Sequence, residues 1–169
     1  MTAELLVLIV LPALLALAAG YDIASFTIPN FLQAALIASF VVFAIASGLA
    51  PAAIGGHLLA GFIGLVVGFT LFALGYVGGG DAKLFACVAL WLGFGSLLDY
   101  TLIAAVMGGG LSLLIIALRQ WPLPALLSRQ DWILRLHDAK GGIPYGVALA
   151  AGAFFVLPQT EIFRMAALG

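Results

Sequence analysis

The sequence predicts an all-α integral membrane protein with about six transmembrane helices and an amphipathic segment between the fifth and the sixth. Hydrophobic residues make up 65% of the 169 residues and charged residues only 8%, whereas soluble domains are about half apolar and a quarter charged. Long apolar runs recur between short stretches rich in Gly, Pro or charge, and a spanning helix needs ~20 such residues. The net charge of −1 gives no indication of a nucleic-acid partner.

The spans are predicted over residues 3–20, 31–49, 54–76, from the turn at 78–81 to 98, 100–118 and 143–158. We expect the first to be a spanning helix and not a cleavable signal peptide, because no Lys or Arg precedes it and Glu4 does. Residues 21–30 are expected to form a loop, with Asn30 and Gln33 as a capping box for the second helix.

The positions of glycines and of charged residues predict further features of the third span, the fifth span and the segment that follows it. Gly64 and Gly68 form a GxxxG pair, which predicts close packing of the third span against another helix. The triplet at 108–110 predicts either a tight crossing or a hinge in the fifth span. Residues 119–141 combine Trp with Arg and Lys, so they are interpreted as an interfacial segment with an amphipathic helix over 125–137.

The cations lie mainly on one side of this predicted topology. The loops at 21–30, 77–83 and 119–141 together hold all but one of the six Lys and Arg residues, and the other side holds only Arg164. The positive-inside rule therefore predicts that these loops face the cytoplasm and that both termini lie outside.

Two aspartates are predicted to meet at the cytoplasmic boundary. Asp22 ends the first span and Asp81 starts the fourth, and the two intervening spans return the chain to the same face. The other acids fit worse, because they lie on the opposite side or among basic residues: Glu4, Asp99, Glu161, Asp131 and Asp138. An acid close to a membrane is costly, which favours a functional role for this pair.

Paired carboxylates have a specific chemistry. Two of them close together resist double ionisation, so the pair holds one proton and titrates as a unit. The ionised partner takes a proton from water while the other donates a hydrogen bond to a scissile carbonyl. A helix N-terminus favours Asp81 as the anion and a helix C-terminus favours Asp22 as the acid, although the roles can exchange.

The glycines before Asp81 allow two interpretations. Gly78, Gly79 and Gly80 form either a flexible turn or an edge on which an extended substrate backbone docks, since residues without Cβ let that backbone come close. His57, His137 and Cys87 have no second His or Cys at ligand spacing, so no metal and no cofactor are predicted.

Three motifs resemble those of the type IV prepilin peptidases, which are GxGD intramembrane aspartic proteases. They are Gly-Gly-Gly-Asp-Ala-Lys-Leu at 78–84, Asp22 followed by Ile-Pro-Asn at 28–30, and Ile-Pro-Tyr-Gly at 143–146. The resemblance implies that Asp22 and Asp81 are catalytic, and it favours substrate binding by Gly78, Gly79 and Gly80 over the flexible turn. It also implies that the leader of prepilin or pseudopilin precursors is removed at the cytoplasmic face of the bacterial inner membrane.

The chain resembles the short members that serve Flp-type pili. A single peptidase domain over 1–169 is expected, without the methyltransferase or zinc-binding insert of larger members, because the chain has one cysteine. One departure is that the loop after Asp22 contains no Lys or Arg, unlike that of many relatives. The sequence leaves open which precursor is cleaved and whether the chain is a homo-oligomer.

Two alternatives remain. A presenilin or signal-peptide-peptidase-like protease would also use Tyr-Asp and GxGD, but the Pro-Ala-Leu at 124–126 lies in the charged loop, where we interpret it as chance. A small membrane transporter or assembly subunit would use Asp22 and Asp81 to bind a proton or a cation. That second class predicts that Asp→Asn changes leave precursor processing intact.

Overall fold

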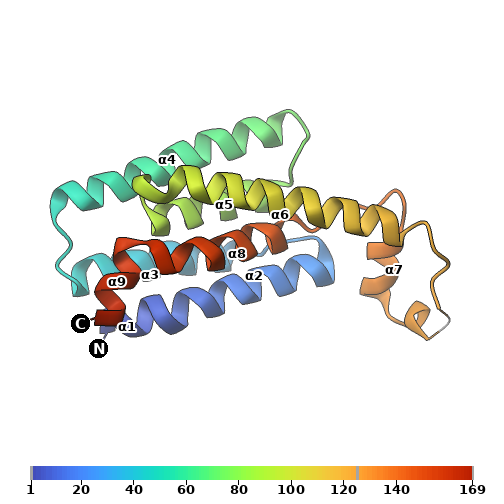
Figure 1. Ribbon diagram of the computed structural model, residues 1–169, viewed down its shortest axis with the longest axis horizontal. Coiled ribbons are helices and arrows are strands. Elements are labelled where there is room, and N and C mark those ends of the chain that lie inside the picture. Colours follow the sequence, from blue (N-terminus) through green and yellow to red (C-terminus); the bar gives the residue numbers. More distant parts are fainter. Residues whose placement is uncertain (1, 125, 169) are drawn as a thin grey trace.

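The computed structural model describes residues 2–124 and 126–168, and within them it contains helices and no strand. In chain order the elements are α1 (Thr2–Leu5), η1 (Leu6–Val10), α2 (Leu11–Ser25), α3 (Asn30–Ala46), α4 (Pro51–Ala73), α5 (Gly79–Leu92), η2 (Phe94–Ser96), α6 (Leu97–Leu118), η3 (Leu127–Arg129), α7 (Asp131–His137), α8 (Tyr145–Val156), η4 (Leu157–Gln159) and α9 (Glu161–Leu168). The long helices lie side by side along one axis (Figure 1).

Three helices are long and apolar enough to cross a membrane: Thr2–Ser25, Pro51–Ala73 and Phe94–Leu118. A fourth span is formed if the pair Tyr145–Gln159 and Glu161–Ala167, bent by 63°, counts as one. The chain is therefore an integral membrane protein. Six spans stay a prediction, because α3 has 17 residues and α5 has 14, fewer than the ~20 that usually cross a bilayer.

Several helix ends differ from those predicted. The first helix continues through Ser25, so the first half of the predicted loop at 21–30 is helical, and the chain turns at Phe26 with a positive φ of 52°. The fourth helix ends at Leu92 and not at 98, because Gly93 takes a φ of 79° that breaks the helix. Each change comes from a local backbone conformation that hydropathy does not encode.

The predicted amphipathic helix over 125–137 is shorter in the structure. Residue 125 lies outside the described residues, and α7 begins only at Asp131 after the short turn η3. Gln130, between the two, is extended, with φ −105° and ψ 114°. An interfacial role for this part of the chain stays a prediction.

The glycines of α4 pack against α5 as the GxxxG pattern predicts. A Cβ at Gly64 would lie 2.9 Å from Ala89 Cβ, and one at Gly68 would lie 2.8 Å from the carbonyl oxygen of Ala82. Real Cβ atoms do not come this close, so the two backbones approach only because these side chains are absent.

We expect Gly68→Val to destabilise the protein by about 1–3 kcal/mol, the usual range for overpacking a core. The measurement is unfolding of the detergent-solubilised protein. Gly55→Val is the matched control in the same helix, because no atom of the described residues lies within 4 Å of a Cβ there. Equal stability of the two variants would contradict the close packing of α4 against α5 at Gly68.

The triplet at 108–110 marks a helix crossing and not a hinge. α6 runs through it without a break. A Cβ at Gly108 would lie 2.8 Å from Cε1 of Tyr145, whereas nothing lies within 4 Å of one at Gly109 or Gly110. The first glycine therefore lets α6 pass close to the start of α8.

The helix that carries Asp81 lies at the centre of the bundle. α5 packs against α3, α4, α6 and α8, and most of its side chains after Lys83 are buried. Trp91 is fully buried and donates its indole N–H to the carbonyl of Leu36 at 2.8 Å. Asp81 is therefore held by a helix with contacts on several sides.

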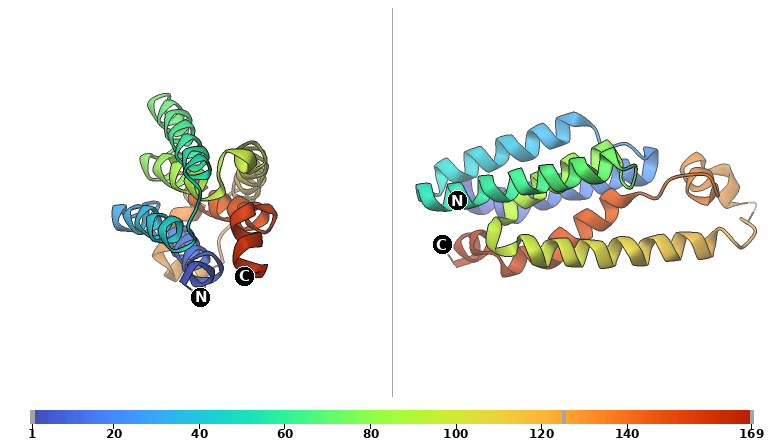
Figure 2. Two further views of the ribbon diagram at one scale, coloured as in Figure 1. Left: turned by 90° about the vertical axis from the view of Figure 1, so that its left-hand side faces the viewer. Right: turned by 90° about the horizontal axis from the view of Figure 1, so that it is seen from above.

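The two ends of the bundle differ in what they carry. The α2–α3 turn, the α4–α5 turn and the segment with α7 lie at one end, which we call the aspartate end (Figure 1). Both termini lie at the other, together with the connection from α3 to α4 (Figures 1 and 2). This arrangement brings the C-terminal end of α2 and the start of α5 to the same side of the molecule.

Candidate active site

Asp22 lies in the last turn of α2 and is only 3% exposed. Its Oδ2 accepts a hydrogen bond of 2.6 Å from the backbone N–H of Gly146, near the start of α8. A Cβ at 146 would lie 2.8 Å from that oxygen and 2.8 Å from Cδ1 of Ile28. Gly146 is therefore the residue that allows Asp22 to reach the α8 backbone.

Asp81 is the third residue of α5 and lies beside its N-terminus. Its Oδ2 accepts a hydrogen bond of 3.2 Å from the N–H of Gly78. Its Oδ1 is buried and has no hydrogen-bond partner among the described residues. Because buried polar atoms are nearly always paired in folded proteins, this oxygen is available for a group that is not part of the chain.

The structure brings the two aspartates together, as the span count predicts. Both line a cavity of about 190 Å³ at the aspartate end. A water molecule occupies about 30 Å³ in the liquid, so the cavity has room for several waters or for a short piece of substrate backbone.

The three glycines before Asp81 do not form one extended edge. Gly78 is extended, with φ −71° and ψ 152°, but Gly79 and Gly80 already belong to the first turn of α5. The carbonyl of Gly80 accepts a hydrogen bond of 3.2 Å from Nε2 of Gln33. Direct pairing with a substrate strand is thus restricted to the backbone at and before Gly78, and substrate contact by these glycines stays a prediction.

The predicted capping box of Asn30 and Gln33 is wrong. Pro29 occupies the N-cap position of α3 and the helix has no side-chain cap there. Instead, Asn30 Oδ1 accepts a hydrogen bond of 2.9 Å from Nζ of Lys83, and Gln33 bonds Gly80. Both side chains therefore connect α3 to the first turns of α5, next to Asp81, a role that the local sequence pattern does not reveal.

A model of the type IV leader peptidase family matches residues 9–113, a range that includes Asp22 and Asp81. The chain belongs to the type IV leader peptidase family. Comparison with curated proteins found no match, and comparison with solved structures found none either. Family membership makes the chain a membrane peptidase that acts on precursor peptides. Gly146 lies beyond the matched range, so its contact with Asp22 is known from the structure alone.

A second cavity adjoins Asp81 in the peptidase. It has a volume of about 300 Å³ and lies between α4, α5, α6 and α8. Its walls are largely apolar and include Leu71, Phe85 and Leu149, and Asp81 is the charged residue among them. Asp81 therefore lies at a junction between a small polar cavity shared with Asp22 and a larger apolar one.

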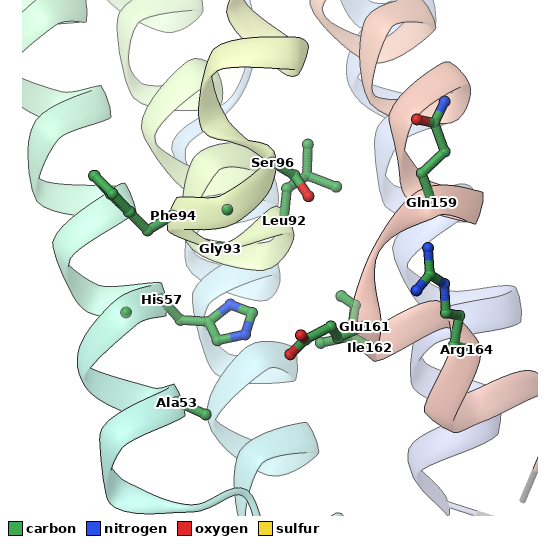
Figure 3. Close-up of a pocket in the computed structure, with 12 residues that line it drawn as sticks. Ala53, His57, Leu92, Gly93, Phe94, Ser96, Gln159, Glu161, Ile162 and Arg164 are labelled. Carbon is green, nitrogen blue, oxygen red and sulfur yellow. The ribbon is translucent and has the colours of Figure 1, made fainter.

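A cavity of about 370 Å³ lies at the opposite end of the peptidase and contains neither aspartate (Figure 3). His57 points into it across from Glu161 (Figure 3). The Nδ1 of His57 donates to the carbonyl of Leu90 at 2.8 Å, which satisfies a backbone acceptor where α5 ends. His57 thus has a structural role. Among the described residues, no three His, Cys, Asp or Glu side chains gather as metal ligands.

Proposed function

We propose that this peptidase is an aspartic endopeptidase with Asp22 and Asp81 as its catalytic pair. We propose further that it removes the basic leader from prepilin-like precursors at the cytoplasmic face of the bacterial inner membrane. The observation that carries the proposal is the shared cavity. A buried Asp22 lies in it together with Asp81, whose Oδ1 has no hydrogen-bond partner among the residues that the structure describes.

The pair would act with one shared proton. The ionised carboxylate accepts a proton from water as the water oxygen attacks the scissile carbonyl carbon, and the protonated partner hydrogen-bonds the carbonyl oxygen. The tetrahedral intermediate then collapses as the C–N bond breaks and the leaving amine takes up a proton from the pair. Asp81 beside a helix N-terminus suits the base, and Asp22 in a last helical turn suits the acid.

The charges around the site support a cytoplasmic orientation. The aspartate end carries Lys83 and the basic residues of 119–144, namely Arg119, Arg129, Arg135 and Lys140, whereas Arg164 belongs to α9 at the other end. The positive-inside rule places such an end in the cytoplasm. A precursor whose leader stays inside the cell would then meet the aspartates directly.

The test is co-expression of the peptidase with candidate precursors, with the new N-terminus of each product read by mass spectrometry. We expect wild-type protein to remove the leader and the double variant Asp22→Asn/Asp81→Asn to leave the precursor intact. Processing that continues in the double variant would overturn the proposal and favour a proton- or cation-binding role for the pair.

A further inference from the structure

We propose that residues 119–144, here called the α6–α8 segment, dock on the lipid headgroups of the leaflet at the aspartate end. We also propose that this docking holds Asp22 in its working position through Arg135. The docking is independent of the proposed function, whereas the link to catalysis rests on it. The partner is a lipid surface with anionic headgroups.

The position of the segment keeps it beside the bilayer. The spanning helix Phe94–Leu118 ends directly before it, and α8, the first half of the bent pair, begins directly after it. α7 lies against α2 and α6 at the aspartate end, beyond the main body of the bundle (Figures 1 and 2). The two ends of the segment therefore join membrane-embedded helices at the level where the lipid headgroups begin.

The surface of the segment has the composition of a membrane interface. Trp121 is 73% exposed, Leu126 77% and Trp132 41%. The two tryptophans also line an apolar cavity of about 320 Å³ in the segment. Trp side chains favour the level of the headgroups, and exposed apolar groups of this size are unfavourable in water.

The charges of the segment favour anionic lipids. It carries four cations, Arg119, Arg129, Arg135 and Lys140, against the carboxylates Asp131 and Asp138. Basic residues next to a spanning helix are attracted to anionic headgroups by about 1 kcal/mol each near the surface. Exposed aromatic groups together with a net positive charge fit a leaflet of this kind better than the neutral, apolar face of another protein.

Hydrogen bonds connect the segment to the helix that carries Asp22. Nη2 of Arg135 donates to the carbonyl of Ala24 at 2.6 Å, two residues after Asp22. This carbonyl belongs to the last turn of α2, where acceptors lack partners within the helix and a cation is favourable. Arg135 is therefore a positioning residue for the end of α2.

A second connection reaches the partner of Asp22 on α8. Arg119 donates from Nε to the carbonyl of Leu136 and from Nη2 to that of Gly142, both at 2.8 Å. The chain then continues from Gly142 to Gly146, whose N–H binds Asp22. Both supports of Asp22, the end of its own helix and the start of α8, are thus attached to the α6–α8 segment.

Tryptophan quenching by brominated lipids tests the docking without any activity measurement. The full-length protein is placed in bilayers whose lipids carry bromine either close to the headgroups or near the chain ends. We expect the shallow bromines to quench more strongly, and we expect Trp121→Phe/Trp132→Phe to lose most of that quenching, because the remaining Trp91 is fully buried. Equal shallow quenching of the double variant and the wild type would overturn the docking.

Lipid-dependent activity tests the link to Asp22. We expect wild-type activity to be higher in bilayers that contain phosphatidylglycerol than in phosphatidylcholine alone. Arg135→Gln should lower kcat about tenfold or more, as expected when a charged hydrogen bond is lost, and should reduce this lipid dependence, while Arg135→Lys restores part of both.

Arg164→Gln is the control, because it removes the same charge at the opposite end. It should keep wild-type activity and lipid dependence. Wild-type kcat and lipid dependence in Arg135→Gln would overturn the positioning role. If the wild-type protein cleaves no precursor, the proposed function fails, and the quenching result still decides whether the segment docks.

Discussion

Replacing either aspartate by asparagine is expected to lower kcat for leader removal by about 100- to 10,000-fold, the range for a missing general acid or base. Asparagine keeps the size of the side chain but neither holds the shared proton nor accepts one from water. The measurement is single-turnover cleavage of a purified precursor by each variant in the same detergent or bilayer.

The two single variants and the double variant should be about equally inactive. Groups that act as a unit show strongly non-additive losses, because removal of one already disables the other. Asp99→Asn is the matched control, since Asp99 is exposed and belongs to the first turn of α6 at the other end of the bundle. A single variant with wild-type kcat, or losses that simply multiply in the double variant, would exclude a catalytic pair.

Gly146→Ala is expected to reduce kcat by about 100-fold with a smaller change in KM. The new methyl group would lie 2.8 Å from Oδ2 of Asp22 and from Cδ1 of Ile28, so α8 or the carboxyl group must shift. A displacement of about 1 Å at a reacting group costs rates of this order. The comparison is made under single-turnover conditions with folded protein.

Gly20→Ala serves as the control for Gly146→Ala, because Gly20 is exposed in α2, two residues before Asp22, and nothing lies within 4 Å of a Cβ there. We expect that variant to keep wild-type kcat and to gain slightly in helix stability. Full activity in Gly146→Ala would show that catalysis does not require the close approach of α8 to Asp22 that the glycine allows.

The pairing of Asp22 with Asp81 could be predicted because it depends on chain topology. Each span returns the chain to the opposite face, so an even number of spans is enough to place two residues on the same side. Close packing of the third span against another helix could also be predicted from Gly64 and Gly68, because a GxxxG pair in an apolar helix usually lies at a helix contact. That the partner is α5 came from the structure.

The neighbours of the pair could not be predicted in this way. Lys83 and Asn30 are 53 positions apart, and Gly146 and Asp22 are 124 positions apart. Such bonds depend on how helices are rotated about their axes, which hydropathy does not determine. Only the Ile-Pro-Tyr-Gly motif at 143–146 indicated a role for Gly146, and this motif was recognised through the resemblance to a family.

Helix ends were predicted least well, for physical reasons that differ between elements. The first helix continues to Ser25 because the polar residues after Gly20 still fit a helix whose end is bound by Arg135. Asn30 does not cap α3 because Pro29 already occupies that position. In both places a contact or a backbone conformation outweighs the local propensity.

The separation of the termini from the aspartates makes the membrane orientation directly measurable. Because both chain ends lie at the end opposite the shared cavity, a short epitope at either end would leave the carboxyl groups undisturbed. Antibody labelling of both tags in intact spheroplasts, without permeabilisation, would report the sidedness of the peptidase independently of catalysis.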